Sequence, residues 1–225
     1  MSFLGDVRYS LRMLLKHPLT TAVAAITSAL GIGANTAIFS LMNQALAGSF
    51  QYKDLDTLLI VQAENKKDGR RRSISAPDFR DFREQNTVFE AMGTFRGTQF
   101  IIDKGGEALP LPAMLVTTNL FPILGLPPLK GRFFREDEGV RGNEKVIIFS
   151  EGFWTRQFGR DPDILGRRVR LNGEMYEVVG IMPTGFWRQM EAWAPMVFTD
   201  DEMSASSRGV RDLRVWARLK PGKTV

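Results

Sequence analysis

Residue types that could carry chemistry are few in this chain, and they restrict what it can do. The sequence contains no cysteine and a single histidine, His17. Thiol nucleophiles, disulfide scaffolds, Cys/His zinc sites and histidine-based triads are therefore nearly all excluded. The remaining carboxylates, lysines, serines and tyrosines show no spacing typical of an acid/base pair, a nucleophile or a metal site. We expect no catalytic residue, no cofactor and no metal.

Two segments resemble nucleotide-binding loops, but neither has the context that such a loop needs. Residues 31–36 (GIGANT) have two glycines of a dinucleotide fingerprint, yet Thr36 replaces the third glycine and no strand precedes it. Residues 217–224 (ARLKPGKT) fit a relaxed phosphate-loop pattern. Residues 217–219, however, have the pattern of a strand and not of a glycine-rich loop, and no helix is predicted after them whose N-terminus could hold phosphate. We expect neither to bind a nucleotide.

Clusters of charge have simpler explanations. The acidic run at residues 136–138 lacks the spacing of a calcium loop and predicts a solvated turn. Asp78 and Asp81 lie on one turn of a predicted helix, where Asp78 completes a capping box with Ser75. The basic run at residues 66–72 (KKDGRRR) has no interleaved aromatic residue, so we predict a solvated turn and no nucleic-acid partner.

Charge is unevenly distributed along the chain. The 30 Lys and Arg against 25 Asp and Glu give a net charge of +5, but none of them lies between Lys16 and Lys53. Within this gap, residues 19–47 exceed the ~20 residues that cross a hydrocarbon core. Small side chains recur every fourth residue on one helix face: Ala25, Ala29, Gly33 and Ala37. We predict a transmembrane helix over 19–47 that packs closely against a partner helix through this face.

Two other interpretations of residues 19–47 stay open. A signal peptide would end at a motif like Ala45-Leu46-Ala47, although the segment is longer than the usual 15 to 30 residues. A buried helix of a soluble protein is the other alternative. Residues 1–18 predict an amphipathic helix, either at the cytoplasmic headgroup layer or against other protein.

The residues that flank the span predict its orientation. Before it lie Arg8, Arg12 and Lys16; behind it Lys53 is outweighed by acidic residues, including Asp54. Positive residues stay cytoplasmic, so we expect a cytoplasmic N-terminus and an extracytoplasmic C-terminal domain.

Residues 53–225 have the composition of a water-soluble domain, and their pattern predicts an α+β fold with mostly antiparallel pairing. Helices are predicted from Ser75, from Asn119 to Leu124, where Gly125 supplies the left-handed C-terminal residue, and at 151–158 after the cap Ser150. The first helix is expected to carry Phe79, Phe82, Phe89 and Met92 on one stripe that faces the core. Strands are predicted at 58–63, 95–102, 109–117, 146–149, 167–171, 174–181, 193–198 and 213–219. Asn172-Gly173 is a strong hairpin signal between two of them.

Several segments resemble the MacB-type ABC transporter permeases, in particular their large orphan-permease branch. Residues 6–43 (DVRYSLRMLLKHPLTTAVAAITSALGIGANTAIFSLMN) are similar to the start of such a permease. Further matching segments follow in the family's order: SAPDFRDF, TTNLFPILGLPPLKGRFF, FSEGFWTRQFGRDPDILGRRVRLNGEMYEVVGIMP and RVWARLKPGKT. The most specific parts are LGIGANTAIFS and the hairpin around Asn172 and Gly173.

The resemblance implies an inner-membrane permease subunit with a periplasmic core domain, in which a β-rich subdomain is inserted into a porter-like part. Such a subunit transmits the motion of a cytoplasmic ATPase to the periplasm for efflux or export, a process called mechanotransmission. Its implied partners are the ATPase subunit, a second permease copy or the remaining permease helices, a periplasmic adaptor and the lipid bilayer. This sequence has one predicted span, so we expect a single-pass chain with an incomplete core domain that cannot transport alone. The alternative is a membrane-anchored extracytoplasmic binding or adaptor domain.

Overall fold

The computed structural model describes residues 27, 29, 32, 33, 52, 54–65, 69–104, 106–183, 187 and 189–223. The chain divides into two compact units, Met1–Ser49 and Phe50–Val225. In the first unit the described residues Thr27, Ala29, Ile32 and Gly33 are helical and exposed. Among the described residues, no helix has the length and apolar character needed to cross a membrane. The predictions for residues 1–18 and most of 19–47 lie outside the described residues.

The second unit is an α+β domain, as predicted. Its strands are β1 (Leu58–Val61), β2 (Ala63–Glu64), β3 (Arg71–Arg72), β4 (Phe89–Lys104), β5 (Glu107–Val116), β6 (Lys130–Gly131), β7 (Val146–Ser150), β8 (Arg168–Leu171), β9 (Glu174–Met182), β10 (Ala192–Pro195) and β11 (Arg214–Leu219). Its α-helices are α3 (Ala76–Gln85), α4 (Leu120–Leu124) and α5 (Glu151–Phe158), and its 3₁₀ helices are η1 (Leu55–Thr57), η2 (Glu136–Gly139) and η3 (Ala205–Gly209).

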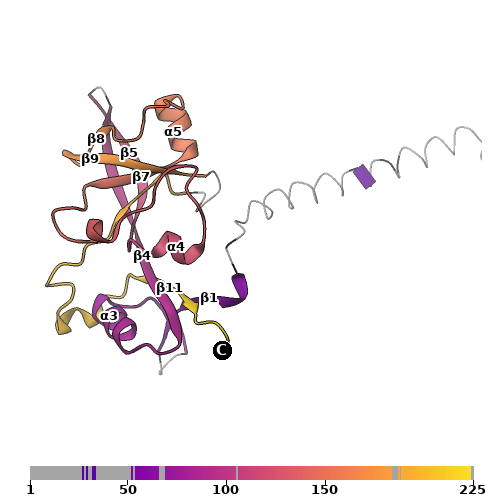
Figure 1. Cartoon of the computed structure of the whole chain (residues 1–225), viewed down its shortest axis with the longest axis vertical. Helices are drawn as coiled ribbons and strands as arrows, with labels where there is room; N and C mark the ends of the chain where they lie inside the picture. The colour runs from indigo at the N-terminus through magenta and orange to yellow at the C-terminus, as the bar shows by residue number, and fades with distance from the viewer. Residues whose placement is uncertain are drawn as a thin grey trace, which may run out of the picture. The chain divides into compact units, whose positions relative to one another are not determined.

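Within the described part of the chain, nine strands form one sheet in the order β1-β11-β4-β5-β10-β7-β9-β6, with β8 paired to β4 and β9. Most neighbours are antiparallel; β10 with β5 and β7 with β9 are parallel. Strand β4 runs from the end of the domain that carries α3, β1 and β11 toward the end that carries β8, β9 and α5 (Figure 1). The two ends of the domain therefore share one sheet.

Helices cover this sheet on both faces. Alternate residues of β7 point to opposite sides, so that Phe149 contributes to the core under α5 and Ile148 to the core beside α4. At the β1–β11 end, α3 contributes Phe79 to a further cluster that contains Met92 and Val215. Each such aromatic or large aliphatic side chain contributes about 1.5–3 kcal/mol by leaving water.

Several local predictions are confirmed because short-range chemistry decides them. Ser75 and Ser150 cap α3 and α5 by accepting bonds from backbone N–H groups, from Asp78 at 3.3 Å and from Phe153 at 3.1 Å. Asn172 (φ 49°) and Gly173 (φ 84°) join β8 to β9 in the left-handed conformation that a tight hairpin needs.

The predicted stripe of Phe79, Phe82, Phe89 and Met92 on one helix is wrong. The α3 helix ends at Gln85, and Phe89 and Met92 lie in β4. The cause is the Asn86 side chain, whose oxygen accepts bonds from the N–H groups of Val88 at 2.8 Å and Phe89 at 2.6 Å. This local turn ends the helix and starts the strand.

Other element bounds also differ from the predictions. The predicted strand at 58–63 is broken after Val61, and the strand predicted at 193–198 is β10, which ends at Pro195. Asn119 lies at the predicted start of α4, but its side chain donates to Met92 O at 3.0 Å and makes no capping bond. Gly125 ends α4 with φ 70°, as predicted.

The prediction of a solvated turn at residues 136–138 fails at Glu138, whose side chain is 2% exposed. Its carboxylate accepts two bonds from the Arg132 guanidinium, at 2.6 and 2.9 Å, and one from the Arg135 N–H at 2.7 Å. Burial by itself raises the pKa of Glu138, but the bonds from Arg132 and Arg135 outweigh that effect and lower the pKa overall. This pair fixes η2 to the chain that follows β6.

We expect Gly131→Ala to lower the free energy of unfolding by about 2 kcal/mol more than Gly142→Ala does. Both glycines have positive φ, but a Cβ on Gly131 would lie 2.3 Å from Val179 O, whereas nothing lies within 4 Å of one on Gly142. Denaturant unfolding measures the difference. Equal losses for the two variants would mean that the close approach of β6 to β9 contributes nothing.

We expect Glu138→Gln to lower the free energy of unfolding at neutral pH by about 3 kcal/mol, because it breaks a buried ion pair. The folded pKa of Glu138 lies below its unfolded value, so the stabilisation is complete above the unfolded pKa and is lost as the pH falls through the folded pKa. Urea unfolding as a function of pH should therefore show the variant and the wild type converging in acid. Glu136→Gln, on the exposed side of the same turn, is the control and should change stability by less than about 0.5 kcal/mol.

Candidate functional site

The first and last strands of the domain's sheet lie side by side. Strand β1 pairs with β11 from Leu58↔Arg218 to Val61↔Val215, and β11 pairs with β4 on its other side. Both chain ends of the domain thus meet at one end of the sheet, where β1 is an edge strand (Figure 1). We call this region, formed by η1, β1 and β11, the base of the domain.

Arg218 joins the elements of the base to one another. Its guanidinium donates to Thr57 Oγ1 at 2.7 Å and to Asp54 O at 3.3 Å, both in the segment that leads into β1. From the other side it donates to Ile123 O at the end of α4, with Nε at 3.0 Å. One side chain therefore connects the segment before β1, the last strand and a helix of the core.

Helix α4 reaches Arg218 because it lies directly on the sheet. A Cβ on Gly93 of β4 would lie 3.0 Å from Ile123 Cδ1 and 3.1 Å from Leu120 Cδ1. Gly93 pairs with Trp216, so this close approach occurs on the sheet face that also carries Arg218. The glycine permits the helix to approach until its last carbonyls meet the guanidinium.

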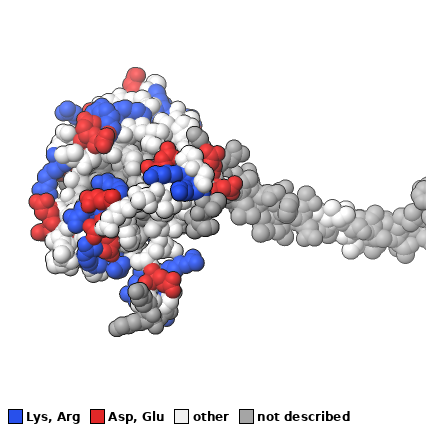
Figure 2. All heavy atoms as spheres, turned by 60° about the horizontal axis from the view of Figure 1, so that its bottom comes forward, with Lys and Arg blue, Asp and Glu red and all other residues white. Residues whose placement is uncertain are grey.

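Ion pairs hold η3 against α3 near the base. Arg208 donates to Asp78 at 2.6 Å and to Asp81 at 2.5 Å, and Arg211 lies 3.4 Å from Asp78. The hydrogen bond from Arg208 is the main cause that lowers the pKa of Asp81. The predicted capping box is only half formed, because the Asp78 carboxylate pairs with these arginines. On the face drawn in Figure 2, acidic and basic side chains likewise lie next to each other, which is typical of a solvated surface and not of a nucleic-acid interface.

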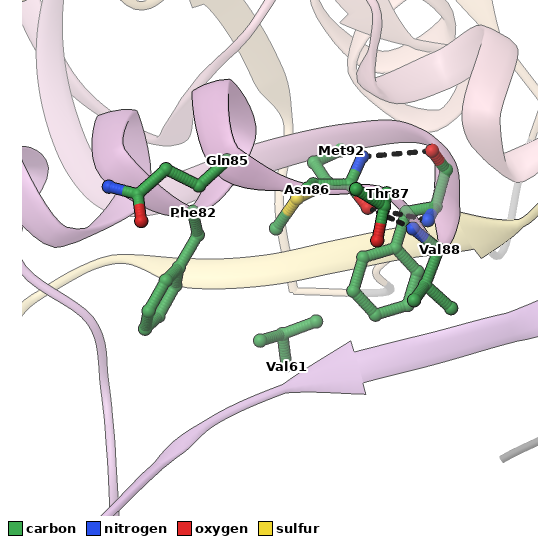
Figure 3. A pocket seen from close by; sticks show the side chains of 8 residues that line it. Val61, Phe82, Gln85, Asn86, Thr87, Val88 and Met92 are labelled. Carbon is green, nitrogen blue, oxygen red and sulfur yellow. Dashed lines mark hydrogen bonds between the residues drawn. The ribbon is translucent and has the colours of Figure 1, made fainter.

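An apolar hollow of about 330 Å³ opens on one face of the base (Figure 3). Val61 of β1 and Phe82 of α3 border it together with the start of β4, and Phe82 is 44% exposed. The turn residues Asn86, Thr87 and Val88 form its rim. A predicted core position, Phe82, is therefore part of a surface hollow.

A second hollow of about 370 Å³, here called the arginine hollow, lies beside β1. Its walls combine three exposed arginines with aromatic and aliphatic side chains from β1, β4 and β11; the residues used below are Ile60, Arg71, Arg72, Trp187, Arg214 and Trp216. In β11, Arg214, Trp216 and Arg218 alternate with Val215 and Ala217, which are fully buried. The sequence signal that could have identified this surface is this two-residue period.

The structure tests the other predicted sites only in part. Ala29 and Gly33 are helical, whereas Ala25 and Ala37 lie outside the described residues. In the phosphate-loop lookalike, residues 217–219 belong to β11, as their pattern indicated. Among the described side chains, no group of three or more His, Asp or Glu is placed to hold a metal.

Comparison with known proteins gives one family. The sequence matches the MacB-like periplasmic core domain over residues 21–225. A comparison with curated proteins gives no match.

Solved structures share the fold at low sequence identity. The periplasmic region of MacB from Actinobacillus actinomycetemcomitans aligns with a TM-score of 0.55 and 15% identity, covering 75% of this chain and 77% of that one. A domain from Porphyromonas gingivalis, described as that of a permease protein, gives 0.56 and 18%, over 77% and 80% of the two chains. The extracellular domain of the noncanonic ABC-type transporter YknZ, from Gram-positive bacteria, gives 0.50 and 16%, over 73% and 83%.

We expect Arg218→Met to lower the free energy of unfolding by about 1.5–3 kcal/mol, because Ile123 O loses its charged donor. The local effect should be larger than the global one: amide exchange of residues 55–61 and 120–124 should accelerate, while exchange in β7 and β9 should follow global stability. Hydrogen-exchange mass spectrometry measures both. Arg170→Met, an exposed residue of β8, is the control. A uniform acceleration over the domain would contradict a connecting role for Arg218.

Proposed function

The chain belongs to the family of MacB-like periplasmic core domains, and on that premise we propose that it is part of a permease subunit of an ABC-type transporter. Its extracytoplasmic domain would couple the motion of a cytoplasmic ATPase to a substrate or partner in the periplasm, for efflux or export. The segment 19–47 would be the membrane helix that carries this motion. The N-terminus and residues 1–18 would then lie on the cytoplasmic side, near the ATPase.

The observation that carries this proposal is the pairing of β1 with β11 at the base. The chain enters the domain through β1, and β11 lies between β1 and the long strand β4. A displacement of the segment before β1 would reach β4 through two rows of backbone hydrogen bonds and the Arg218 contacts. Strand β4 continues to the β4–β5 hairpin at the far end of the domain. A stiff path of this kind is what mechanical transmission requires.

The partners follow from the same proposal. ATP hydrolysis would take place on a separate ABC ATPase subunit, and we propose no enzymatic activity for this chain. A second copy, or the remaining helices of the permease, would pack on the small-residue face formed by Ala25, Ala29, Gly33 and Ala37. A periplasmic adaptor would contact the domain.

A membrane-anchored binding or adaptor domain without a transport cycle is the second candidate function. The two hollows at the base favour it, because both are open surfaces able to take a partner. Affinity purification of the tagged chain from its native membrane separates the two candidates. Recovery of an ABC ATPase supports the permease subunit, and its absence alongside another stable partner supports the adaptor.

The absence of cysteine permits a direct topology test. We expect Ser206→Cys, at an exposed residue of η3, to react with a membrane-impermeant maleimide in intact spheroplasts. Ser10→Cys, before the predicted span, should react only after permeabilisation. The cysteine-free wild type is the control for background labelling. Labelling of Ser10→Cys in intact spheroplasts would contradict the proposed orientation.

A further inference from the structure

The arginine hollow combines cationic and aromatic side chains on one side of the base. Ile60 of β1 and Trp216 of β11 are paired opposite each other. Arg214 lies two residues before Trp216, on the same face of β11, and also lines the hollow. Arg71 and Arg72 belong to β3, which pairs with β2 in the segment that follows β1. Two segments far apart in sequence thus place their guanidinium groups on one hollow.

The described residues that line this hollow include three arginines and no aspartate or glutamate. Within the described residues, neither Arg71 nor Arg214 forms an ion pair, whereas Arg208, Arg96 and Arg132 elsewhere in the domain do. Guanidinium groups bind phosphate oxygens through paired hydrogen bonds, so an anionic phosphate is the complementary ligand.

The apolar part of the hollow fits the boundary of a membrane. Ile60 is 58% exposed, and Trp187 and Trp216 are partly buried. Tryptophan is enriched at the headgroup level of bilayers, because its ring has an apolar body and a polar N–H. A phosphate flanked by apolar chains matches this combination better than a fully hydrated anion does.

The linker between the predicted span and the hollow is short. The Tyr52 ring lies 5.6 Å from that of Trp216 in the hollow wall. Only four residues, 48–51, lie between Ala47, the end of the predicted span, and Tyr52, so the two Cα atoms are at most about 18 Å apart. The headgroup layer is itself about 5–8 Å thick on each side of the hydrocarbon core. If residues 19–47 span the membrane, a linker of this length permits the hollow to reach the lipid phosphates.

We propose that the arginine hollow binds the phosphate headgroup of an anionic phospholipid in the extracytoplasmic leaflet. Arg71, Arg72 and Arg214 hold the phosphate, while Trp216 and Ile60 contact the adjoining apolar part of the lipid. This inference rests on the proposed function, because it requires residues 19–47 to span the membrane. Lipid bound there would hold the base at a defined distance from the bilayer.

The test uses the full chain in phosphatidylcholine nanodiscs with or without about 30% phosphatidylglycerol. A phosphatidylcholine spin-labelled at its headgroup quenches nearby tryptophan, and Trp216→Phe identifies the share of Trp216 among the four tryptophans. We expect phosphatidylglycerol to increase the quenching. The increase should be lost in Arg71→Gln/Arg72→Gln/Arg214→Gln and kept in Arg141→Gln/Arg168→Gln/Arg170→Gln, three exposed arginines outside the hollow.

The outcomes separate this inference from the proposed function. A chain that does not elute with the discs overturns both. A chain that elutes with the discs but shows no effect of phosphatidylglycerol, or the same effect in both triple variants, overturns the lipid site alone. Inorganic phosphate in solution should leave the increase unchanged; if it abolishes the increase, the hollow is a site for free phosphate. Arginine-dependent binding of poly-glutamate without any lipid effect would assign the hollow to an acidic polypeptide.

Discussion

Strand β4 is the constraint on which the domain depends. It pairs with β11 from Phe89 to Phe95, with β5 from there to Lys104, and with β8 at Ile102 and Asp103. Its side chains also enter each hydrophobic cluster: Met92 the one under α3, Phe95 the one beside α4, and Phe100 the one under α5. The two ends of the domain cannot separate without breaking this strand's hydrogen bonds, so the sheet behaves as one stiff element.

Polar contacts reinforce the sheet where elements cross it. Arg218 donates to Ile123 O at the end of α4, and to Asp54 O and Thr57 Oγ1 before β1. At the other side of the core, where η2 lies near β6 and β9, the Arg132 guanidinium donates two hydrogen bonds to the Glu138 carboxylate. In both places one guanidinium binds several acceptors from different nitrogens of a rigid planar fork, whereas all three donors of a lysine lie on one nitrogen.

Both hollows lie beside strand β1. Val61 of β1 borders both hollows, whereas Ile60 and Trp216 border only the arginine hollow. A partner in the arginine hollow therefore contacts both β1 and β11, and one in the apolar hollow contacts β1, α3 and the start of β4.

Local chemistry made much of the fold predictable. The caps Ser75 and Ser150, the Asn172-Gly173 turn and the Gly125 stop each depend on a few adjacent residues, and the structure confirms them. The sequence pattern also indicated the α+β class and most strands. It failed at Phe89 and Met92, where the Asn86 turn overrides a helical spacing that continues through it.

The sequence by itself determined the family, the α+β class and the exclusion of thiol and most histidine chemistry, because these depend on residue types and on spacings within short segments. Only the tertiary structure decided that Glu138 is buried on Arg132, that Arg218 meets α4, and that Arg71 shares a hollow with Arg214. Each of these contacts joins segments whose distance in space depends on strand order and on the position of α4 over Gly93. Charge clusters in a sequence do not carry that information, because burial and partners are properties of the assembled sheet.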